Sequence, residues 1–113
     1  MYEYNAKIVR WVDGDTVDLE VDLGFTVLLR QRFRLLGINT PEVRGAEKEA
    51  GHAATAFASA LAPLGSAVVV VSTKTGKFGR WLGEIYPTKE GGRRLQSINS
   101  ALLEAGHAVP YGG

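Results

Sequence analysis

The chain has 113 residues, of which 45% are hydrophobic and 22% charged, so we expect one globular domain over residues 1–113. It contains no cysteine, which excludes a disulfide framework, a Cys-ligated metal and a Cys nucleophile. Thirteen basic and twelve acidic residues leave a net charge of +1, so an anion site must come from local arrangement. Without a long apolar stretch or an apolar leader, we expect a cytoplasmic protein with no membrane partner, although secretion stays open.

The first half of the chain is rich in β patterns. Lys7 to Trp11 and Asp15 to Asp22 read as strands, and Asp13-Gly14 is the turn signal between them. After a second turn at Leu23-Gly24, residues Phe25 to Ile38 alternate and predict one long strand. One face of that strand carries three arginines, namely Arg30, Arg32 and Arg34.

The second half combines helices with strands. Ala46 to Ala62 predicts a helix with an apolar face formed by Ala53, Phe57 and Leu61. The remaining predictions are strands at Ala67 to Val71 and Trp81 to Tyr86, a polar loop from Ser72 to Gly79, and a helix marked by Leu95, Ile98, Leu102 and Leu103 that ends at Gly106. Five strands and two helices predict an α+β, mainly β, OB-type barrel.

Asp15 lies on the apolar face of its strand, together with Val17, Leu19 and Val21. Burying an unpaired carboxylate is costly, so a buried Asp15 needs an arginine or a metal ion beside it. The alternative is that Asp15 follows a turn and stays hydrated at the strand end. Periodicity alone favours this second interpretation.

Oxygen-bearing side chains follow the arginine strand. Asn39, Thr40 and Glu42 surround a proline that interrupts the strand, and Arg34 lies close by in the sequence. Such hard oxygen donors suit Ca²⁺ or Mg²⁺ better than zinc. The alternative is a plain loop in which Glu42 begins a helix.

A basic segment precedes the Trp81 strand. Lys77, Phe78 and Arg80 place two cations beside an aromatic ring, a combination that can hold a phosphate and stack a base. The plainer interpretation of this segment is a basic turn. The plainer interpretation of Arg93-Arg94 is a solvated approach to a helix. His52 and His107 lack metal-ligand spacing, and we expect structural or surface roles for both.

Three motifs together resemble the staphylococcal nuclease (thermonuclease) family in order and approximate spacing. They are Val12-Asp13-Gly14-Asp15-Thr16-Val17, Phe33-Arg34-Leu35-Leu36-Gly37-Ile38-Asn39-Thr40-Pro41-Glu42 and Lys77-Phe78-Gly79-Arg80. The resemblance runs from about Ala6 through Tyr111. It implies an OB-fold barrel with helices and a calcium-dependent phosphodiesterase. Such an enzyme cuts DNA and RNA, preferably single-stranded or unpaired, with little sequence preference and leaves 3′-phosphate ends.

The resemblance also implies roles for individual residues. Asp15 matches a metal carboxylate, Thr40 matches a metal ligand through its backbone carbonyl, and Asp13 matches a more peripheral acid. Glu42 matches the glutamate that orients or deprotonates water. The two arginines that match phosphate-binding positions are Arg34 and Arg80, and the three positions near the nucleotide are Lys77, Phe78 and Tyr111.

Two positions depart from the family pattern. Asn39 stands where members place a second metal-binding aspartate, which predicts weaker calcium binding. Phe78 replaces a tyrosine and loses a hydroxyl. The alternative functions are a catalytically silent nuclease-like module that binds nucleic acid or a protein, and a generic OB-type nucleic-acid binder. We expect the protein to be a monomer.

Overall fold

The computed structural model describes residues 2–75, 80–89 and 92–111. Its strands are β1 (Tyr2–Asp13), β2 (Thr16–Asp22), β3 (Leu28–Leu35), β4 (Ile38–Asn39), β5 (Ala67–Thr75), β6 (Trp81–Lys89), β7 (Arg93–Arg94) and β8 (Val109–Pro110). Its helices are the 3-10 turn η1 (Gly45–Glu47), α1 (Lys48–Leu61) and α2 (Ile98–Glu104). Within the described residues, no helix is both long enough and apolar enough to cross a membrane.

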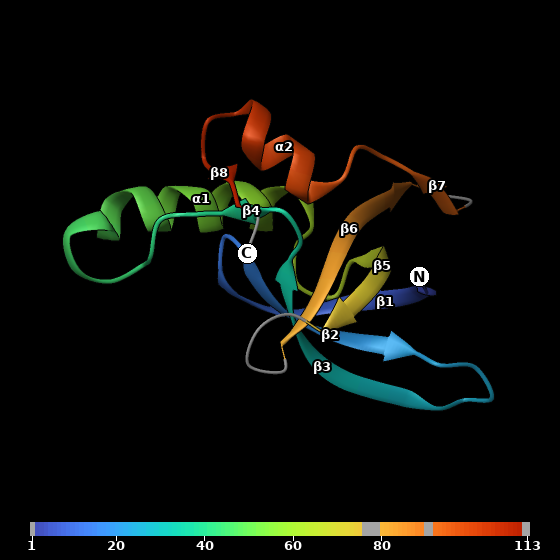
Figure 1. Ribbon diagram of the computed structural model, residues 1–113. Helices are drawn as coiled ribbons and strands as arrows, with labels where there is room; N and C mark the ends of the chain where they lie inside the picture. Colours follow the sequence, from blue (N-terminus) through green and yellow to red (C-terminus); the bar gives the residue numbers. More distant parts are fainter. Residues whose placement is uncertain (1, 76–79, 90–91, 112–113) are drawn as a thin grey trace.

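Five long strands close into a barrel, as the sequence predicts. The sheet order is β3-β2-β1-β5-β6, and all of these neighbours are antiparallel. The barrel closes through a parallel pairing of β3 with β6, in which Phe33 lies opposite Trp81 and Arg34 opposite Leu82. The two helices lie together on one side of the barrel (Figure 1). The fold is therefore mainly β, with an OB-like barrel and two helices.

The alternating segment Phe25 to Ile38, predicted as one strand, contains one turn before β3 and a second turn between β3 and β4. Phe25 and Thr26 adopt left-handed backbone angles with φ of 55° and 61°, and they turn the chain before β3 begins. Gly37 has a φ of 80°, a conformation that costs glycine little, and it turns the chain between β3 and β4. The pattern of alternation continues through such turns, which is why the sequence did not reveal them.

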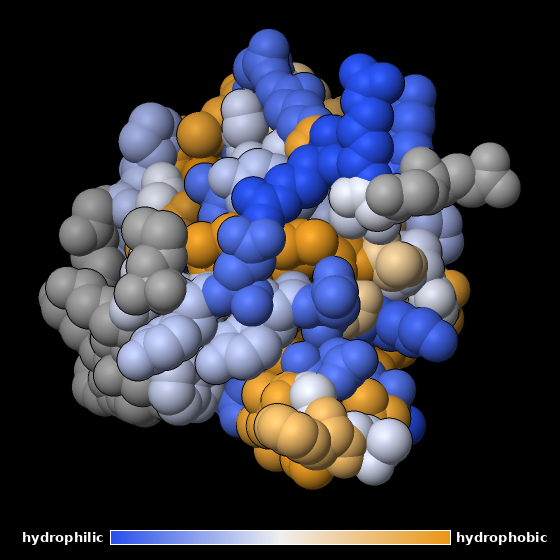
Figure 2. All heavy atoms as spheres, turned by 90° about the vertical axis from the view of Figure 1, so that its right-hand side faces the viewer, coloured by the Kyte–Doolittle hydropathy of each residue, from blue (hydrophilic) through white to orange (hydrophobic). Residues whose placement is uncertain are grey.

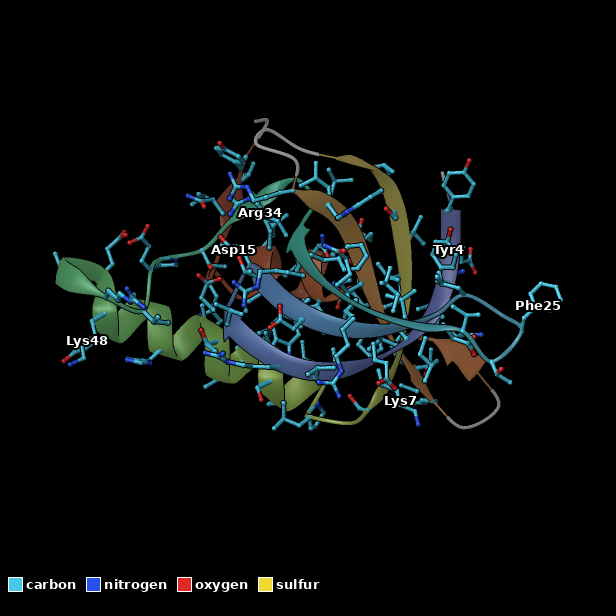
Figure 3. All side chains as sticks on the ribbon, turned by 90° about the horizontal axis from the view of Figure 1, so that it is seen from below. Tyr4, Lys7, Asp15, Phe25, Arg34 and Lys48 are labelled. Carbon is cyan, nitrogen blue, oxygen red and sulfur yellow. The ribbon has the colours of Figure 1, made fainter. Side chains whose placement is uncertain are left out.

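An apolar hairpin end projects from the barrel between β2 and β3. Phe25 is 98% exposed, and the neighbouring Leu28 and Val27 are also exposed. Figure 2 shows apolar side chains gathered at the lower edge of this face of the molecule. Figure 3 places Phe25 at one end of the molecule and Lys48 of α1 at the other, whereas Asp15 and Arg34 lie next to each other between them, well away from Phe25.

The barrel interior and the helices share one apolar core. Its largest fully buried side chains are Leu19, Leu35, Ile38, Ile85, Ile98, Leu102, Val17, Val68 and Val70. Trp11 from β1 donates its indole N–H to the carbonyl of Ala62 at 2.8 Å, so one end of α1 is fastened to the barrel. Burial of these side chains from the strands and from α2 is the main stabilising contribution to the fold.

The predicted apolar face of α1 is wrong. Helix α1 begins at Lys48, and it buries Gly51, Ala54 and Ala58 instead of Ala53 and Leu61, which are exposed. Small residues on the buried face allow the helix to approach the barrel closely. The packing gained by this close approach outweighs the burial that larger side chains would provide. Only partly buried Phe57 from the predicted face packs against the core.

The predictions for the last third of the chain need three further corrections. Strand β5 runs on to Thr75 into the predicted polar loop, and β6 reaches Lys89. Helix α2 begins only at Ile98, so Leu95 precedes it and is exposed; within the helix Ile98 and Leu102 are buried as predicted, but Leu103 is exposed. Arg93–Arg94 is a strand, not an approach to a helix, because β7 pairs with the end of β6. There Arg94 forms an ion pair with Glu3.

Candidate active site

Asp15 is buried in the turn between β1 and β2, with only 4% of its surface exposed. Its Oδ2 accepts the backbone N–H of Thr40 at 3.0 Å, and its Oδ1 accepts the hydroxyl of Thr16 at 3.0 Å. The Arg34 guanidinium supplies the cation, with 3.3 Å between Nη1 and Oδ2. The interpretation of Asp15 as a hydrated turn residue is therefore wrong, because the turn is covered by the loop after β4. A buried Asp15 with an arginine beside it is confirmed.

Arg34 links the end of β3 to the segment that follows it. Its Nη2 donates to Asn39 Oδ1 at 2.9 Å and to the Ile38 carbonyl at 3.3 Å. Its guanidinium lies over the Tyr111 ring, with Cζ 5.1 Å from the ring centroid. The backbone N–H of Leu35 donates to the carbonyl of Asp15 at 2.8 Å, which holds the end of β3 against the Asp15 turn. Arg34 therefore joins three segments that are distant in the sequence.

The side chain of Asp13 lies beside Asp15 and interacts with it. Its Oδ1 accepts the Asp15 backbone N–H at 3.2 Å. Burial, together with the hydrogen bond to Asp15 and the negative charge of Asp15, raises the pKa of Asp13 to about 6. Burial also acts to raise the pKa of Asp15, but hydrogen bonds from Asp13 and the Thr40 N–H and the charge of Arg34 outweigh it, so this pKa is lowered. Below about pH 6, Asp15 is therefore the acid of the pair that keeps its charge, whereas at pH 7 Asp13 is mostly ionised as well.

Replacing Asp13 with asparagine is expected to stabilise the protein at pH 7 in the presence of a chelator. Since the folded state raises the Asp13 pKa to about 6, its contribution to stability is complete below about pH 4 and declines as the pH rises through 6. Asparagine keeps the acceptor oxygen and removes the buried charge. After allowance for the partial exposure of Asp13, we expect a gain of about 1 kcal/mol in the free energy of unfolding. Urea unfolding at pH 7 and pH 4 measures it, and an equal gain at both pH values would contradict this account.

The main chain of Glu42 rests directly on α1 at Gly51. A Cβ added at Gly51 would lie 2.1 Å from the Glu42 carbonyl oxygen and 2.7 Å from the Val43 nitrogen. Backbone atoms cannot move aside as a side chain can. Glycine at this position of α1 is therefore what allows the loop to bring Glu42 to the site.

Replacing Gly51 with alanine is expected to destabilise the fold by about 2–3 kcal/mol, because the loop or the helix must shift. The higher helix propensity of alanine offsets less than about 1 kcal/mol of this cost. Thermal unfolding measures the loss. Ala50→Gly, one residue earlier at an exposed position of the helix, is the control for propensity alone. A Gly51→Ala protein as stable as wild type would show that the loop does not rest there.

Glu42 itself is exposed, and it lines a cavity of about 340 Å³ with Asp13. Through Asp13, this cavity adjoins the Asp15 cluster. The structure thus brings Asp15, Arg34, Asn39, Thr40 and Tyr111 into one network of contacts, and Glu42 joins them through the shared cavity.

The segment before β6 is described from Arg80 onward. Arg80 is exposed, and it precedes Trp81, which lies opposite Phe33 of β3. Arg80 directly precedes β6, and Leu82, two residues further on, is the partner of Arg34 in the register. The predicted nucleotide contacts Lys77 and Phe78 lie outside the described residues.

The donor atoms near Asp15 fit a hard cation. The Asp15 carboxylate, the Asn39 amide oxygen and the main chain of Thr40 offer only oxygen, which suits Ca²⁺ or Mg²⁺. The hydroxyl of Thr40 is buried without a hydrogen-bond partner. Against this, Arg34 already contacts the oxygens of Asp15 and Asn39. In the described part of the chain, three or more His, Cys, Asp or Glu residues nowhere gather into a metal cluster. A cation would therefore share its ligands with Arg34.

Asn99 is an important residue of this region to which sequence reasoning gave no role. It is 2% exposed, and its Oδ1 accepts the backbone N–H of Ile85 at 3.1 Å. Its Nδ2 donates to the carbonyls of Leu36 at 3.0 Å and Gly83 at 3.2 Å. Asn99 thus fastens α2 to the turn after β3, two residues beyond Arg34. An asparagine within a helix pattern was the only available signal.

The closed barrel and the acid–arginine cluster at the end of β3 define a nuclease-like protein of the OB type. The chain belongs to the staphylococcal nuclease homologue family, whose model matches residues 32–112. That match includes Arg34, Asn39 and Glu42. Asp13 and Asp15 precede it, so their place in the site comes from the structure.

Three curated relatives are similar to this chain. Protein ParB of Escherichia coli is 32% identical over 112 residues, which cover 96% of this chain and 58% of the relative. An uncharacterized protein of Methanocaldococcus jannaschii is 29% identical over 130 residues, which cover 96% of this chain and 59% of the relative. An uncharacterized lipoprotein of Mycoplasma pneumoniae is 35% identical over 89 residues, which cover 71% of this chain and 30% of the relative. The chain therefore spans between 30% and 59% of the length of these relatives.

Proposed function

We propose that this chain is a calcium-dependent phosphodiesterase that hydrolyses DNA and RNA with little sequence preference and leaves 3′-phosphate ends. The carrying observation is the buried Arg34–Asp15 pair, with Asn39 on the same guanidinium and Glu42 in the adjoining cavity. Membership of the nuclease family supports this chemistry. We propose single-stranded or unpaired DNA and RNA as the preferred substrates.

Calcium would be held by Asp15, Asn39 and the backbone carbonyl of Thr40. When bound, it neutralises charge on the phosphate and favours attack by water. The all-oxygen ligand set supports calcium, with magnesium as the other candidate. Asn39 supplies an uncharged oxygen where a second aspartate would add a negative charge, so we expect weak binding.

The remaining steps of hydrolysis are assigned to three side chains of the site. Glu42 orients a water molecule and takes its proton as the water oxygen bonds to phosphorus. The bond from phosphorus to the 5′ oxygen breaks, and this oxygen takes a proton from solvent. Arg34 and Arg80 donate to the phosphate oxygens as charge grows in the transition state. Arg34 retains donors for this task, since its present contacts use three of five N–H groups.

Arg80 offers the clearest test of the phosphate contacts, because it is exposed and takes part in none of the ion pairs found among the described residues. We expect Arg80→Gln to lower kcat/KM on single-stranded DNA by about 10²–10³-fold, as loss of one transition-state donor does. The thermal midpoint should not change. Arg93→Gln is the control, because it removes an exposed arginine on β7 at the other end of β6. Equal activity of Arg80→Gln and wild type would overturn the assignment.

Asn39→Asp is expected to tighten calcium binding about ten-fold, because ligand charge raises affinity for calcium. Aspartate keeps the oxygen that Arg34 Nη2 contacts at 2.9 Å and adds a negative charge. Calorimetric titration of both proteins with calcium measures the difference. Equal affinities would mean that residue 39 is not a metal ligand.

A catalytically silent module that binds nucleic acid is the second candidate. It is favoured by one observation, that Arg34 contacts both Asp15 and Asn39 and so provides the cluster with a cation. In that case the ion pair between Arg34 and Asp15 would be purely structural. Binding without cleavage, whatever metal is added, distinguishes this candidate from the enzyme.

A further inference from the structure

The cavity beside the candidate site contains two arginines to which no task has been assigned. Its volume is about 340 Å³, and it is lined by Arg10, Val12, Asp13, Glu42, Val43 and Arg44. Asp13 and Glu42 belong to the candidate active site. Arg10 comes from β1 and Arg44 from the loop after Glu42, so the two guanidinium groups reach one cavity from different segments.

Two irregularities in β1 direct side chains toward this cavity. The register with β2 shifts once between Ile8 and Arg10 and again between Trp11 and Asp13. Ile8 and Trp11 are buried, so strict alternation would also turn Arg10 and Asp13 inward. Each bulge inserts one residue and moves the next side chain to the outer face. The two bulges therefore turn Arg10 and Asp13 toward the cavity that they line. This type of irregularity is common beside active sites.

The charge on Arg10 and Arg44 is available to a ligand. On the same sheet, Arg32 binds Asp18 at 2.7 Å, Arg30 lies 3.8 Å from Glu20, and Arg34 is held by Asp15. None of the ion pairs among the described residues involves Arg10 or Arg44, and both side chains are exposed. Asp18 lies opposite Arg10 in the register, but Arg32 already binds both of its oxygens.

We propose that Arg10 and Arg44 form a second phosphate subsite, which binds the phosphate next to the one that is cleaved on a single nucleic-acid strand. This inference rests on the proposed function. Guanidinium groups donate two parallel hydrogen bonds to phosphate oxygens, and two of them offset the repulsion from Asp13 and Glu42. A repeating chain of phosphates is the ligand that places one anion at Arg34 and another in the adjoining cavity.

The test measures binding with a chelator present, so that cleavage does not interfere. Fluorescence anisotropy gives the Kd of a labelled single-stranded oligonucleotide over a range of salt concentrations, for wild type and for the double variant Arg10→Gln, Arg44→Gln. We expect about ten-fold weaker binding. The slope of log affinity against log salt should fall by about 0.7 for each phosphate on a single strand that the variant no longer neutralises. Arg93→Gln, an exposed arginine at the far end of β6, should bind as wild type does.

A second measurement separates this proposal from the catalytic one. A dinucleotide has one phosphodiester and cannot fill both subsites, so the double variant should cleave it at the wild-type rate while its KM for the oligonucleotide rises. Unchanged affinity and salt slope would overturn the subsite, even if the wild type is an active nuclease. Equal loss of dinucleotide cleavage would also overturn it, by placing the arginines at the cleaved phosphate. A reduced slope in a protein that cleaves nothing would support the subsite and refute the nuclease.

Discussion

Replacing Glu42 with glutamine is expected to lower kcat on single-stranded DNA by about 10²–10⁴-fold, the contribution typical of one positioned proton acceptor. Glutamine keeps the size of the side chain but accepts no proton from water. Because the Glu42 side chain is exposed, the free energy of unfolding should change by less than about 0.5 kcal/mol. KM should change little, since the loss falls on the transition state.

The control for this variant is Glu49→Gln, which removes an exposed acid in the first turn of α1. It changes the net charge equally but lies outside the cavity that Glu42 lines with Asp13. Wild-type kcat is expected for Glu49→Gln. If both variants retained full activity, water would be activated by another group, and Asp13 would be the next acid to test.

Replacing Asn99 with alanine is expected to cause a large loss of stability. The variant loses three hydrogen bonds and leaves the Ile85 N–H without its acceptor in a buried position. Each unsatisfied buried group costs about 1–3 kcal/mol, so we expect a loss of about 3 kcal/mol in the free energy of unfolding. The thermal midpoint should fall by about 15 °C. Chemical unfolding followed by tryptophan fluorescence measures the same loss.

Ser100→Ala is the matched control for Asn99. Ser100 lies one residue further along α2, and its hydroxyl accepts only the exposed Gln96 side chain. We expect a change of less than about 0.5 kcal/mol. If Asn99→Ala were as mild as this control, the link between α2 and the turn after β3 would contribute little, and Arg34 would be positioned by β3 alone.

Periodicity predicted much of the barrel because its strands bury alternate residues. It placed Arg34 on one face with Arg30 and Arg32, and it placed Asp15 on an apolar face, where burial requires a cation. Periodicity alone nevertheless favoured a hydrated Asp15, and its 3.3 Å contact with Arg34 shows that this interpretation is wrong. The roles of Glu42, Arg80 and Tyr111 came from resemblance to a family, and they stay predictions.

Other features depend on contacts that no local pattern contains. The two bulges of β1 change which side chains face outward, and a strictly alternating interpretation of residues 8–13 cannot show them. The close contact of Gly51 with the Glu42 main chain explains why α1 buries small residues, whereas helix patterns emphasise large ones. Asn99 serves backbone groups 14 to 63 residues away in the sequence.

The most direct test of the account is cleavage of end-labelled single-stranded DNA by the wild-type protein with calcium, magnesium or a chelator. We expect calcium to support cleavage, magnesium to support less, and the chelator to abolish it, with products that end in a 3′-phosphate. Removal of that phosphate by a phosphatase would shift the mobility of the fragments. Binding of the DNA with no cleavage in either metal would contradict the account and would leave a nucleic-acid-binding barrel.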